Sequence, residues 1–303
     1  MESIMGIILS KLFCLYAFIL LGYFLGKGKK ELNEHTGILS FLAVSVFLPA
    51  KVFSSFSTYF TVSYIRNNYT MLLISLGLLL VMHFAGKLVA KLFRSKTEDK
   101  GVYEYTVVIS NYGYLGYALM EGVFGPEALT DMILFCLPFS LYTYTVGYMK
   151  LTGGKVGIKR LLNPVTIASL AGMAFGLTGW TMPEMIDGVL SASSACLGPI
   201  AMLLTGLTLS EFSFKRMLGD AKAYGLTAVR LIAVPLFIYL AFTGLGFDAL
   251  LPSALLMAAM PSGLNTIIFP KNLGRSPELG AKLALISHLA SCITLPLWLI
   301  LLQ

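Results

Sequence analysis

The stretch "ISNYGYLGYAL", residues 109–119, lies inside a long apolar segment but carries Asn111, Gly113 and Gly116 near its centre. Apolar segments of roughly 20 residues are typical of membrane-spanning helices. Lipid offers no hydrogen-bond partner to backbone that leaves a helix, and glycine weakens a helix. Residues 103–124 therefore predict a transmembrane helix that is broken near its middle.

The composition places the whole chain in the membrane. Of its 303 residues, 57% are hydrophobic and only 12% are charged, and the mean hydropathy is +0.81. These values are typical of a polytopic membrane protein. The segments long and apolar enough to cross a bilayer are about 4–26, 36–56, 69–93, 103–124, 129–149, 164–180, 188–210, 221–243, 249–270 and 278–301. The predicted fold class is an all-α integral membrane protein with ten transmembrane helices and no soluble domain.

Neither the N-terminus nor the cysteines indicate further processing or chemistry. Met1–Gly6 lacks the basic region of a signal peptide, so we expect the first span to stay in the mature protein. The four cysteines fall inside predicted spans without the spacing of metal ligands. We therefore predict no metal site and no cofactor, while a coupling H⁺ or Na⁺ ion stays open.

The basic residues are sorted by loop. A net charge of +7 suggests nucleic acid as a partner in a soluble protein, but here the sorting reports orientation in the membrane. Arg66 is the basic residue of the even-numbered connections. The odd-numbered connections hold Lys27, Lys29, Lys30, Lys91, Arg94, Lys96, Lys100, Lys150, Lys155, Lys159, Arg160, Lys215, Arg216, Lys222, Lys271, Arg275 and Lys282. We predict odd loops in the cytoplasm, both termini outside, and no nucleic-acid partner.

The positions of helix-breaking residues predict an internal repeat. Pro49 precedes Asn111 by 62 residues, and Pro199 precedes Pro261 by the same 62 residues. An odd number of helices per repeat inverts one repeat relative to the other across the membrane. The predicted units are a first five-helix repeat at 1–150, a short cytoplasmic linker at 151–163 and an inverted five-helix repeat at 164–303.

This register makes "NYGYLG" at 111–116 and "PSGLNT" at 261–266 equivalent points of the fourth and ninth spans. Pro261 removes a backbone donor, so the ninth span should break as well. A broken helix points the positive end of its second half at the gap, which suits a carboxylate. The alternative is that these glycines only allow close helix packing, as expected for Gly22–Gly26 and Gly172–Gly176.

Five motifs together carry a resemblance to a known family: "LPAKVF" in the second span, "SNYGYLGYAL" in the fourth, "NP" at 163–164, "GPIAMLLTGLTL" in the seventh and "MPSGLNTIIFPKNLG" in the ninth. The chain resembles the auxin efflux carrier family, which includes plant auxin exporters and bacterial permeases for malate, malonate and related acids. The short linker at 151–163 is similar to that of the bacterial members.

The resemblance implies a ten-helix fold of two inverted repeats in which broken helices 4 and 9 cross, related to bile acid:sodium symporters and sodium/proton antiporters. It implies a scaffold from helices 1, 2, 6 and 7 that forms a homodimer, and a transport domain from helices 3–5 and 8–10. The implied function is secondary transport of small organic anions across the cytoplasmic membrane by elevator-type alternating access.

Carried over residue by residue, the resemblance puts substrate contacts at Asn111, Gly113, Gly116, Pro261, Ser262, Asn265 and Thr266. Two positions depart from the family pattern. Tyr117 stands where members commonly have proline, and Lys51 stands where an apolar residue is usual after "PA". Lys51 either extends its ammonium to the membrane interface or faces a cavity.

Titratable side chains at membrane depth are further candidates, because each is costly there unless paired or solvated. Arg230 lies about ten residues into its span, about 15 Å deep. It either holds a substrate carboxylate or caps carbonyls of a broken helix. His83 and His288 either couple transport to protons or serve in packing. Glu121, near the outer end of its span, either reaches water or takes part in coupling.

The alternative functional classes are an intramembrane enzyme and a coupled ion transporter. An intramembrane enzyme is disfavoured, because no H-E-x-x-H motif is present and the adjacent Ser287 and His288 cannot face each other on a helix. A sodium- or proton-coupled antiporter or symporter of the related fold would require an acid at the crossover, and the crossing segments contain none. A sodium site built from carbonyls and the two asparagines remains open.

Overall fold

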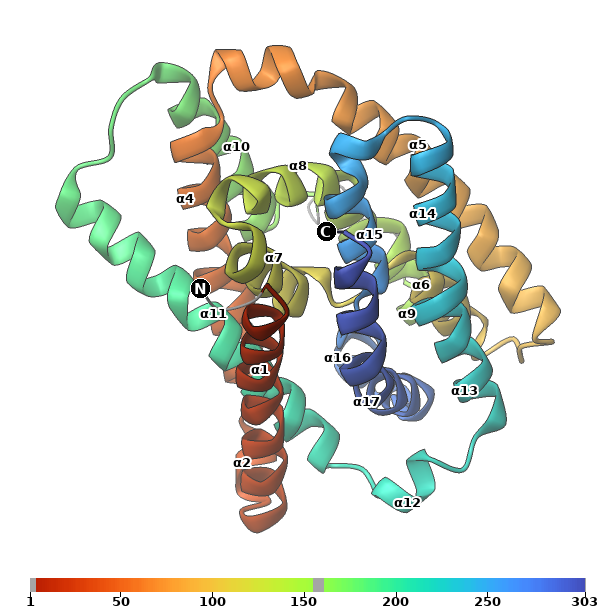
Figure 1. Ribbon diagram of the computed structural model, residues 1–303. Helices are drawn as coiled ribbons and strands as arrows, with labels where there is room; N and C mark the ends of the chain where they lie inside the picture. Colours follow the sequence, from red (N-terminus) through yellow and green to blue (C-terminus); the bar gives the residue numbers. More distant parts are fainter. Residues whose placement is uncertain (1–3, 155–160, 303) are drawn as a thin grey trace. The chain divides into compact units, whose positions relative to one another are not determined.

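The computed structural model describes residues 4–154 and 161–302, and the regular elements there are helices. The described residues divide into two compact units (Figure 1). The first unit comprises residues 4–72, 113–134 and 161–211, and the second comprises 73–112, 135–154 and 212–302. The predicted linker at 151–163 lies partly outside the described residues, at 155–160.

The first unit is built from long apolar helices that pack in pairs. Its elements are α1 (Ile4–Gly28), α2 (Glu31–Glu34), α3 (Thr36–Leu42), η1 (Ala43–Phe47), α4 (Leu48–Tyr59), α7 (Tyr117–Phe124), α10 (Pro164–Thr178) and α11 (Glu184–Ser210), with the start of α5 (Val62–Leu92), the start of α8 (Pro126–Tyr142) and most of the π-helical turn η2 (Tyr112–Gly116). Helix α1 packs along α11, and α4 packs along α10.

Glycines allow these pairs to approach closely. A Cβ atom added at Gly206 of α11 would overlap the carbonyl of Ile19 in α1. One added at Gly172 of α10 would lie 2.9 Å from the carbonyl of Phe53 in α4. Added side chains at Gly22, Gly26 and Gly176 would clash in the same way. The packing interpretation of these glycines is therefore confirmed.

The "NP" pair at 163–164 opens α10 as a helix start. The side chain of Asn163 accepts a hydrogen bond from the N–H of Thr166 at 3.0 Å, and Pro164 occupies the first turn, where its missing N–H costs nothing. Gly179 ends the helix in the left-handed conformation, with φ of 69°.

The second unit contains shorter and more interrupted helices. Its elements are the end of α5, α6 (Lys100–Val108), the end of α8, η3 (Thr143–Gly147), α9 (Tyr148–Thr152), α12 (Phe214–Met217), α13 (Ala221–Ala228), the π-helical turn η5 (Val229–Ala233), α14 (Val234–Gly244), η6 (Asp248–Leu250), α15 (Leu251–Ala259), α16 (Asn265–Lys271) and α17 (Glu278–Ile300). Helix α14 lies beside α15, and α13 packs on α17 (Figure 1).

Both predicted helix breaks are present. The fourth span ends its first helix at Val108 and resumes at η2, and the ninth span ends α15 at Ala259 and resumes at α16. Neither span is a single long helix. Among the described residues, seven helices are long and apolar enough to cross a membrane, and two shorter apolar helices cover Pro164–Thr178 and Asp248–Ala259. The protein is therefore a multi-pass, all-helical membrane protein.

The helix of the third predicted span differs from its expected bounds. Helix α5 begins at Val62 rather than near residue 69 and is 31 residues long. Its first turns carry Arg66 and Asn67, both exposed. A hydropathy pattern marks only the apolar part of a helix, whereas the backbone continues for as long as the residues tolerate helical geometry.

Candidate functional site

The two breaks of the second unit meet each other. Ser110 and Ser262 form an isolated antiparallel bridge, and the N–H of Asn111 donates to the carbonyl of Pro261 at 2.8 Å. A Cβ atom added at Gly263 would lie 3.3 Å from the carbonyl of Ser110, so this approach favours glycine. The backbone that leaves each helix is thus partly satisfied by the other segment, as membrane-embedded irregular backbone requires.

Pro261 explains why α15 ends where it does. In a continuous helix the carbonyl of Met257 would accept from the N–H four residues later, but that residue is Pro261, which has no N–H. The Met257 carbonyl accepts instead from the hydroxyl of Ser110 at 2.6 Å and from Arg230 at 3.0 Å. A single proline thereby creates an acceptor that other elements must satisfy.

Arg230 in η5 serves both broken helices. Its guanidinium is 1% exposed and donates to the carbonyls of Val107, at 2.9 Å, and of Met257 and Met260, at 3.0 and 3.2 Å. Of the two predicted roles, these contacts are those of a cap on the carbonyls of broken helices. None of the ion pairs among the described residues involves Arg230, so its buried charge has no carboxylate partner there.

The polar side chains of the meeting point come from four segments. The amide nitrogen of Asn111 lies 3.3 Å from Nε2 of His288, and Nδ1 of His288 lies 2.7 Å from the carbonyl of Ala284. The amide of Asn265 donates to the hydroxyl of Tyr105 at 3.1 Å. Asn111 and His288 are each 3% exposed, which makes this a buried polar cluster.

The hydroxyl groups of the ninth-span segment differ in how well they are satisfied. Thr266 donates to the carbonyl of Gly263 at 2.9 Å and so closes the turn before α16. The N–H of Ser262 donates to the hydroxyl of Ser287 at 3.0 Å, but the hydroxyl of Ser262 itself is buried without a partner among the described residues. A buried hydroxyl without a partner is costly and marks a place where a ligand or water can bind.

The remaining candidates of the fourth span belong to the first unit. Gly113 and Gly116 lie in η2, and the nearest atom to a Cβ added at Gly113 is a methyl of Leu48 at 4.0 Å. Tyr117, at the start of α7, is buried. The contribution of Gly113 and Gly116 to substrate binding stays a prediction.

Of the two alternatives for Lys51, the structure shows the second, a side chain that faces a cavity. Its side chain is 6% exposed and its ammonium forms an ion pair with Glu121 at 2.6 Å. The pair lines a cavity of about 350 Å³ in the first unit together with Ser55, Thr58 and Asp187. A buried ammonium is retained because the carboxylate of a residue 70 positions away compensates its charge. The sequence alone did not pair these two residues.

A comparison of the sequence with known families decides which family the chain belongs to. The family described as Membrane transport protein, the auxin efflux carrier group, matches residues 7–156 and 148–299. The chain belongs to this family. The resemblance seen in the motifs is confirmed, and so is the expectation that the protein is a transporter and not an enzyme.

Curated relatives of this membrane transport protein are distant but nearly full length. An uncharacterized transporter of Methanothermobacter thermautotrophicus is 26% identical over 92% of this chain and 93% of its own length. A Rhizobium meliloti protein named "Putative malonate transporter" is 24% identical over 97% of this chain and 94% of its own. An uncharacterized transporter of Methanocaldococcus jannaschii is 27% identical over 88% of each chain.

The other histidine candidate of this transporter has a separate environment. Nδ1 of His83 in α5 lies 3.0 Å from the hydroxyl of Tyr142. Its ring also packs edge-on against Tyr142 and Phe84. These contacts of His83 include neither Asn111 nor His288, so its part in coupling stays a prediction separate from the buried cluster.

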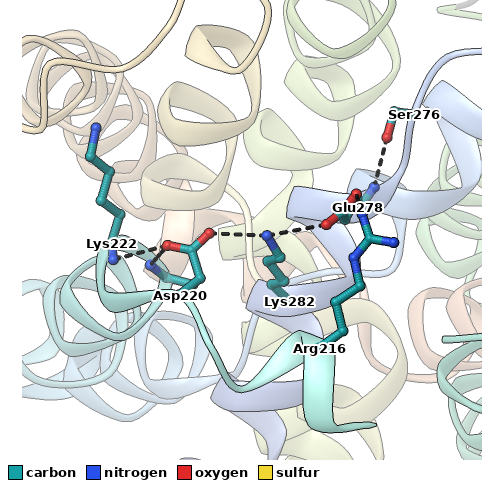
Figure 2. A network of polar contacts seen from close by, with 7 residues as sticks. Arg216, Asp220, Lys222, Ser276, Glu278 and Lys282 are labelled. Carbon is teal, nitrogen blue, oxygen red and sulfur yellow. Dashed lines mark hydrogen bonds and ion pairs between the residues drawn. The ribbon is translucent and has the colours of Figure 1, made fainter. Parts of the chain in front are cut away.

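Figure 2 shows an ion-pair network formed by residues of the predicted cytoplasmic loops. Lys282 in α17 contacts Asp220 at 3.1 Å and Glu278 at 3.3 Å, and Arg216 contacts Glu278 at 3.1 Å. Asp220 also caps α13 by accepting from the N–H of Lys222 at 3.0 Å. The network borders a cavity of about 870 Å³ with balanced charges, which gives it no preference for an anion.

These contacts lower the pKa of the Asp220 carboxyl. Burial alone raises its pKa, but the hydrogen bonds from Lys282 and from the backbone N–H groups at the start of α13 outweigh burial and hold the pKa below its ordinary value. Asp220 therefore stays ionised and ties the start of α13 to α17.

Proposed function

We propose that this transporter is a secondary permease of small organic anions, and that the anion binds where residues 109–111 and 260–265 meet. The substrates would be mono- or dicarboxylates such as malate, malonate or auxin-like acids. The observation that carries the proposal is the buried charge of Arg230, which has no acidic partner among the described residues and lies at the ends of both broken helices. An uncompensated buried cation favours an anionic ligand.

Hydrogen-bond donors for a carboxylate lie at the point where these two segments meet. A carboxylate only accepts hydrogen bonds, and the amides of Asn111 and Asn265 and the unpartnered hydroxyl of Ser262 are donors. Pro261 and Thr266 shape the backbone of the same segment and would contribute through it. Arg230 would act through its charge, because each of its three nitrogens already donates to a carbonyl.

The wider architecture is part of the proposal. Ten helices would form two inverted repeats with crossing helices 4 and 9, and the protein would work as an elevator in the cytoplasmic membrane with both termini outside. A scaffold of helices 1, 2, 6 and 7 would form a homodimer. The grouping of α1–α4, α10 and α11 in one compact unit supports this division, although residues 113–134 fall with them rather than with the transport set.

The first experiment measures binding. Purified full-length protein in detergent is titrated with malonate and a panel of other carboxylates while its thermal unfolding is followed, since a ligand that binds the folded state raises its apparent stability. Wild type should be stabilised, and Asn111→Ala with Asn265→Ala should lose the effect. Asn67→Ala, an exposed asparagine in the first unit, is the matched control and should respond like wild type.

Two results would overturn the proposal. One is stabilisation by no carboxylate at all. The other is undiminished carboxylate transport into proteoliposomes by the double alanine variant. Stabilisation by sodium or protons alone, without any carboxylate, would favour the ion-coupled antiporter or symporter of the related fold.

A further inference from the structure

The hydrogen bonds of His288 fix which of its nitrogens carries a proton. The carbonyl of Ala284 can only accept, so Nδ1, at 2.7 Å from it, is the protonated nitrogen. In the neutral ring Nε2 is then an acceptor. It faces the amide nitrogen of Asn111 at 3.3 Å, which is a donor, so the two groups are complementary in the neutral state.

A second proton on the ring would reverse this complementarity. Nε2–H is a donor and would face another donor, the amide N–H of Asn111. The conflict is removed when the amide turns by about 180°, which brings its oxygen to His288 and its nitrogen to the opposite side. With the neutral ring, one N–H of the amide is left for a ligand; after the turn, both are left.

This exchange links a proton to an anion. A carboxylate prefers the turned amide because it only accepts hydrogen bonds, and the charged imidazolium prefers the same orientation. We propose that His288 is a proton-binding site and that one proton is carried with each bound carboxylate, coupled through the amide of Asn111. The inference rests on the proposed function, which it extends by naming the coupling ion and the residue that holds it.

The positive charges around α17 link proton binding at His288 to carboxylate binding. The elements packed against α17 bring Lys215 and Arg216 on α12, Lys222 and Tyr224 on α13, Arg230 on η5 and Lys271 on α16, while α15 brings no titratable group. Lys282 lies on α17 itself. Of these, Arg230 is the buried cation bound to the same broken helices. A second buried positive charge is therefore unfavourable until a carboxylate arrives, so the carboxylate strengthens proton binding and, by reciprocity, the proton strengthens carboxylate binding.

Three acids of the second unit are already paired with basic side chains. Glu104 on α6 forms ion pairs with Lys150 and Lys100, and Asp220 and Glu278 belong to the network of Figure 2. The phenols of Tyr105 and Tyr112 are the titratable groups of the fourth span beside Asn111. Among the described residues, no ion pair or hydrogen bond joins His288 to a carboxylate, so the substrate carboxylate would have to neutralise its charge.

The test counts protons. Binding of malonate to the purified full chain is measured by calorimetry at one pH in two buffers with different ionisation enthalpies, which gives the number of protons taken up. We expect wild type to take up about one proton more than His288→Gln. The matched control is His83→Gln, the same change in the same unit away from Asn111, and it should take up as many protons as wild type.

A second measurement keeps the test valid if His288→Gln does not fold. The malonate affinity of wild type is measured between about pH 7 and 8.5, where malonate itself stays ionised, and should fall up to tenfold per pH unit. Equal proton uptake by wild type and His288→Gln, or an affinity independent of pH, overturns the proton inference and leaves the proposed function standing. Absence of malonate and other carboxylate binding overturns both.

Discussion

Replacing Arg230 by methionine should destabilise the second unit, because the change removes the donors of three buried carbonyls while keeping a long apolar side chain. The guanidinium is 1% exposed, so water cannot take over its hydrogen bonds without opening the structure. Two of the carbonyls, those of Val107 and Met260, accept only from Arg230 among the contacts described. The third, of Met257, keeps the hydroxyl of Ser110.

The expected magnitude follows from these two carbonyls. A hydrogen bond to a charged group contributes about 1.5–3 kcal/mol, and an unsatisfied buried carbonyl costs a similar amount. Two such losses correspond to about 3–6 kcal/mol. Methionine also removes a buried charge, which relieves part of the desolvation cost. We therefore expect a loss near the lower bound, about 3 kcal/mol, in the free energy of unfolding.

The assay is reversible unfolding of purified protein in mixed micelles, followed by circular dichroism. Arg66→Met is the matched control, because Arg66 is exposed and its replacement should change the free energy of unfolding by less than about 0.5 kcal/mol. If Arg230→Met unfolds within about 1 kcal/mol of Arg66→Met, the carbonyls do not depend on the guanidinium and the capping argument is refuted.

Three further predictions concern other parts of the molecule. Glu121→Gln should lower the free energy of unfolding by about 3–5 kcal/mol because it leaves the buried ammonium of Lys51 unpaired. Lys51→Met should lower it by less than about 2 kcal/mol because the carboxylate left behind, on Glu121, is 41% exposed. Chemical unfolding of both variants measures the difference. The stabilisation from Asp220, whose folded-state pKa is lowered, should be present above about pH 4 and lost as the pH falls through that lower pKa, and Asp220→Asn should abolish this dependence in acid unfolding. Gly206→Ala should destabilise by about 1–3 kcal/mol or more, seen as a lower melting temperature, because its Cβ would overlap the backbone of α1.

The glycines of the fourth span indicated the segment that breaks but not the position of the break, because Gly113 and Gly116 lie within η2 and the backbone leaves the helix at 109–111. The break of the ninth span was predictable because its cause is local, since Pro261 lacks an N–H whatever surrounds it. The same holds for the start of α10, which Asn163 and Pro164 specify within two residues. The close-packing glycines were also predictable, since small residues one helical turn apart on an apolar helix typically let another helix approach closely.

The contact partners of the buried charged residues could not be predicted from the sequence. Lys51 and Glu121 are 70 residues apart, and Arg230 reaches a carbonyl 123 residues away. Charge alone left two roles open for Arg230, because a guanidinium can donate hydrogen bonds to carbonyls as well as to carboxylates. Deciding between them required knowing which acceptors the breaks leave unpaired, and that depends on which helices pack together.

One proline therefore connects the fold to the proposed chemistry. Pro261 leaves the Met257 carbonyl without its helical donor, and that acceptor, with its neighbours at Val107 and Met260, needs a donor that apolar side chains lack. Arg230 supplies the donors but brings a charge that carbonyl dipoles only partly offset. The residual positive charge lies where two broken helices present the amides of Asn111 and Asn265 and a hydroxyl without a partner among the described residues. Under the proposed function, the same arginine that satisfies the backbone of the broken helices would supply the positive charge that attracts an anion.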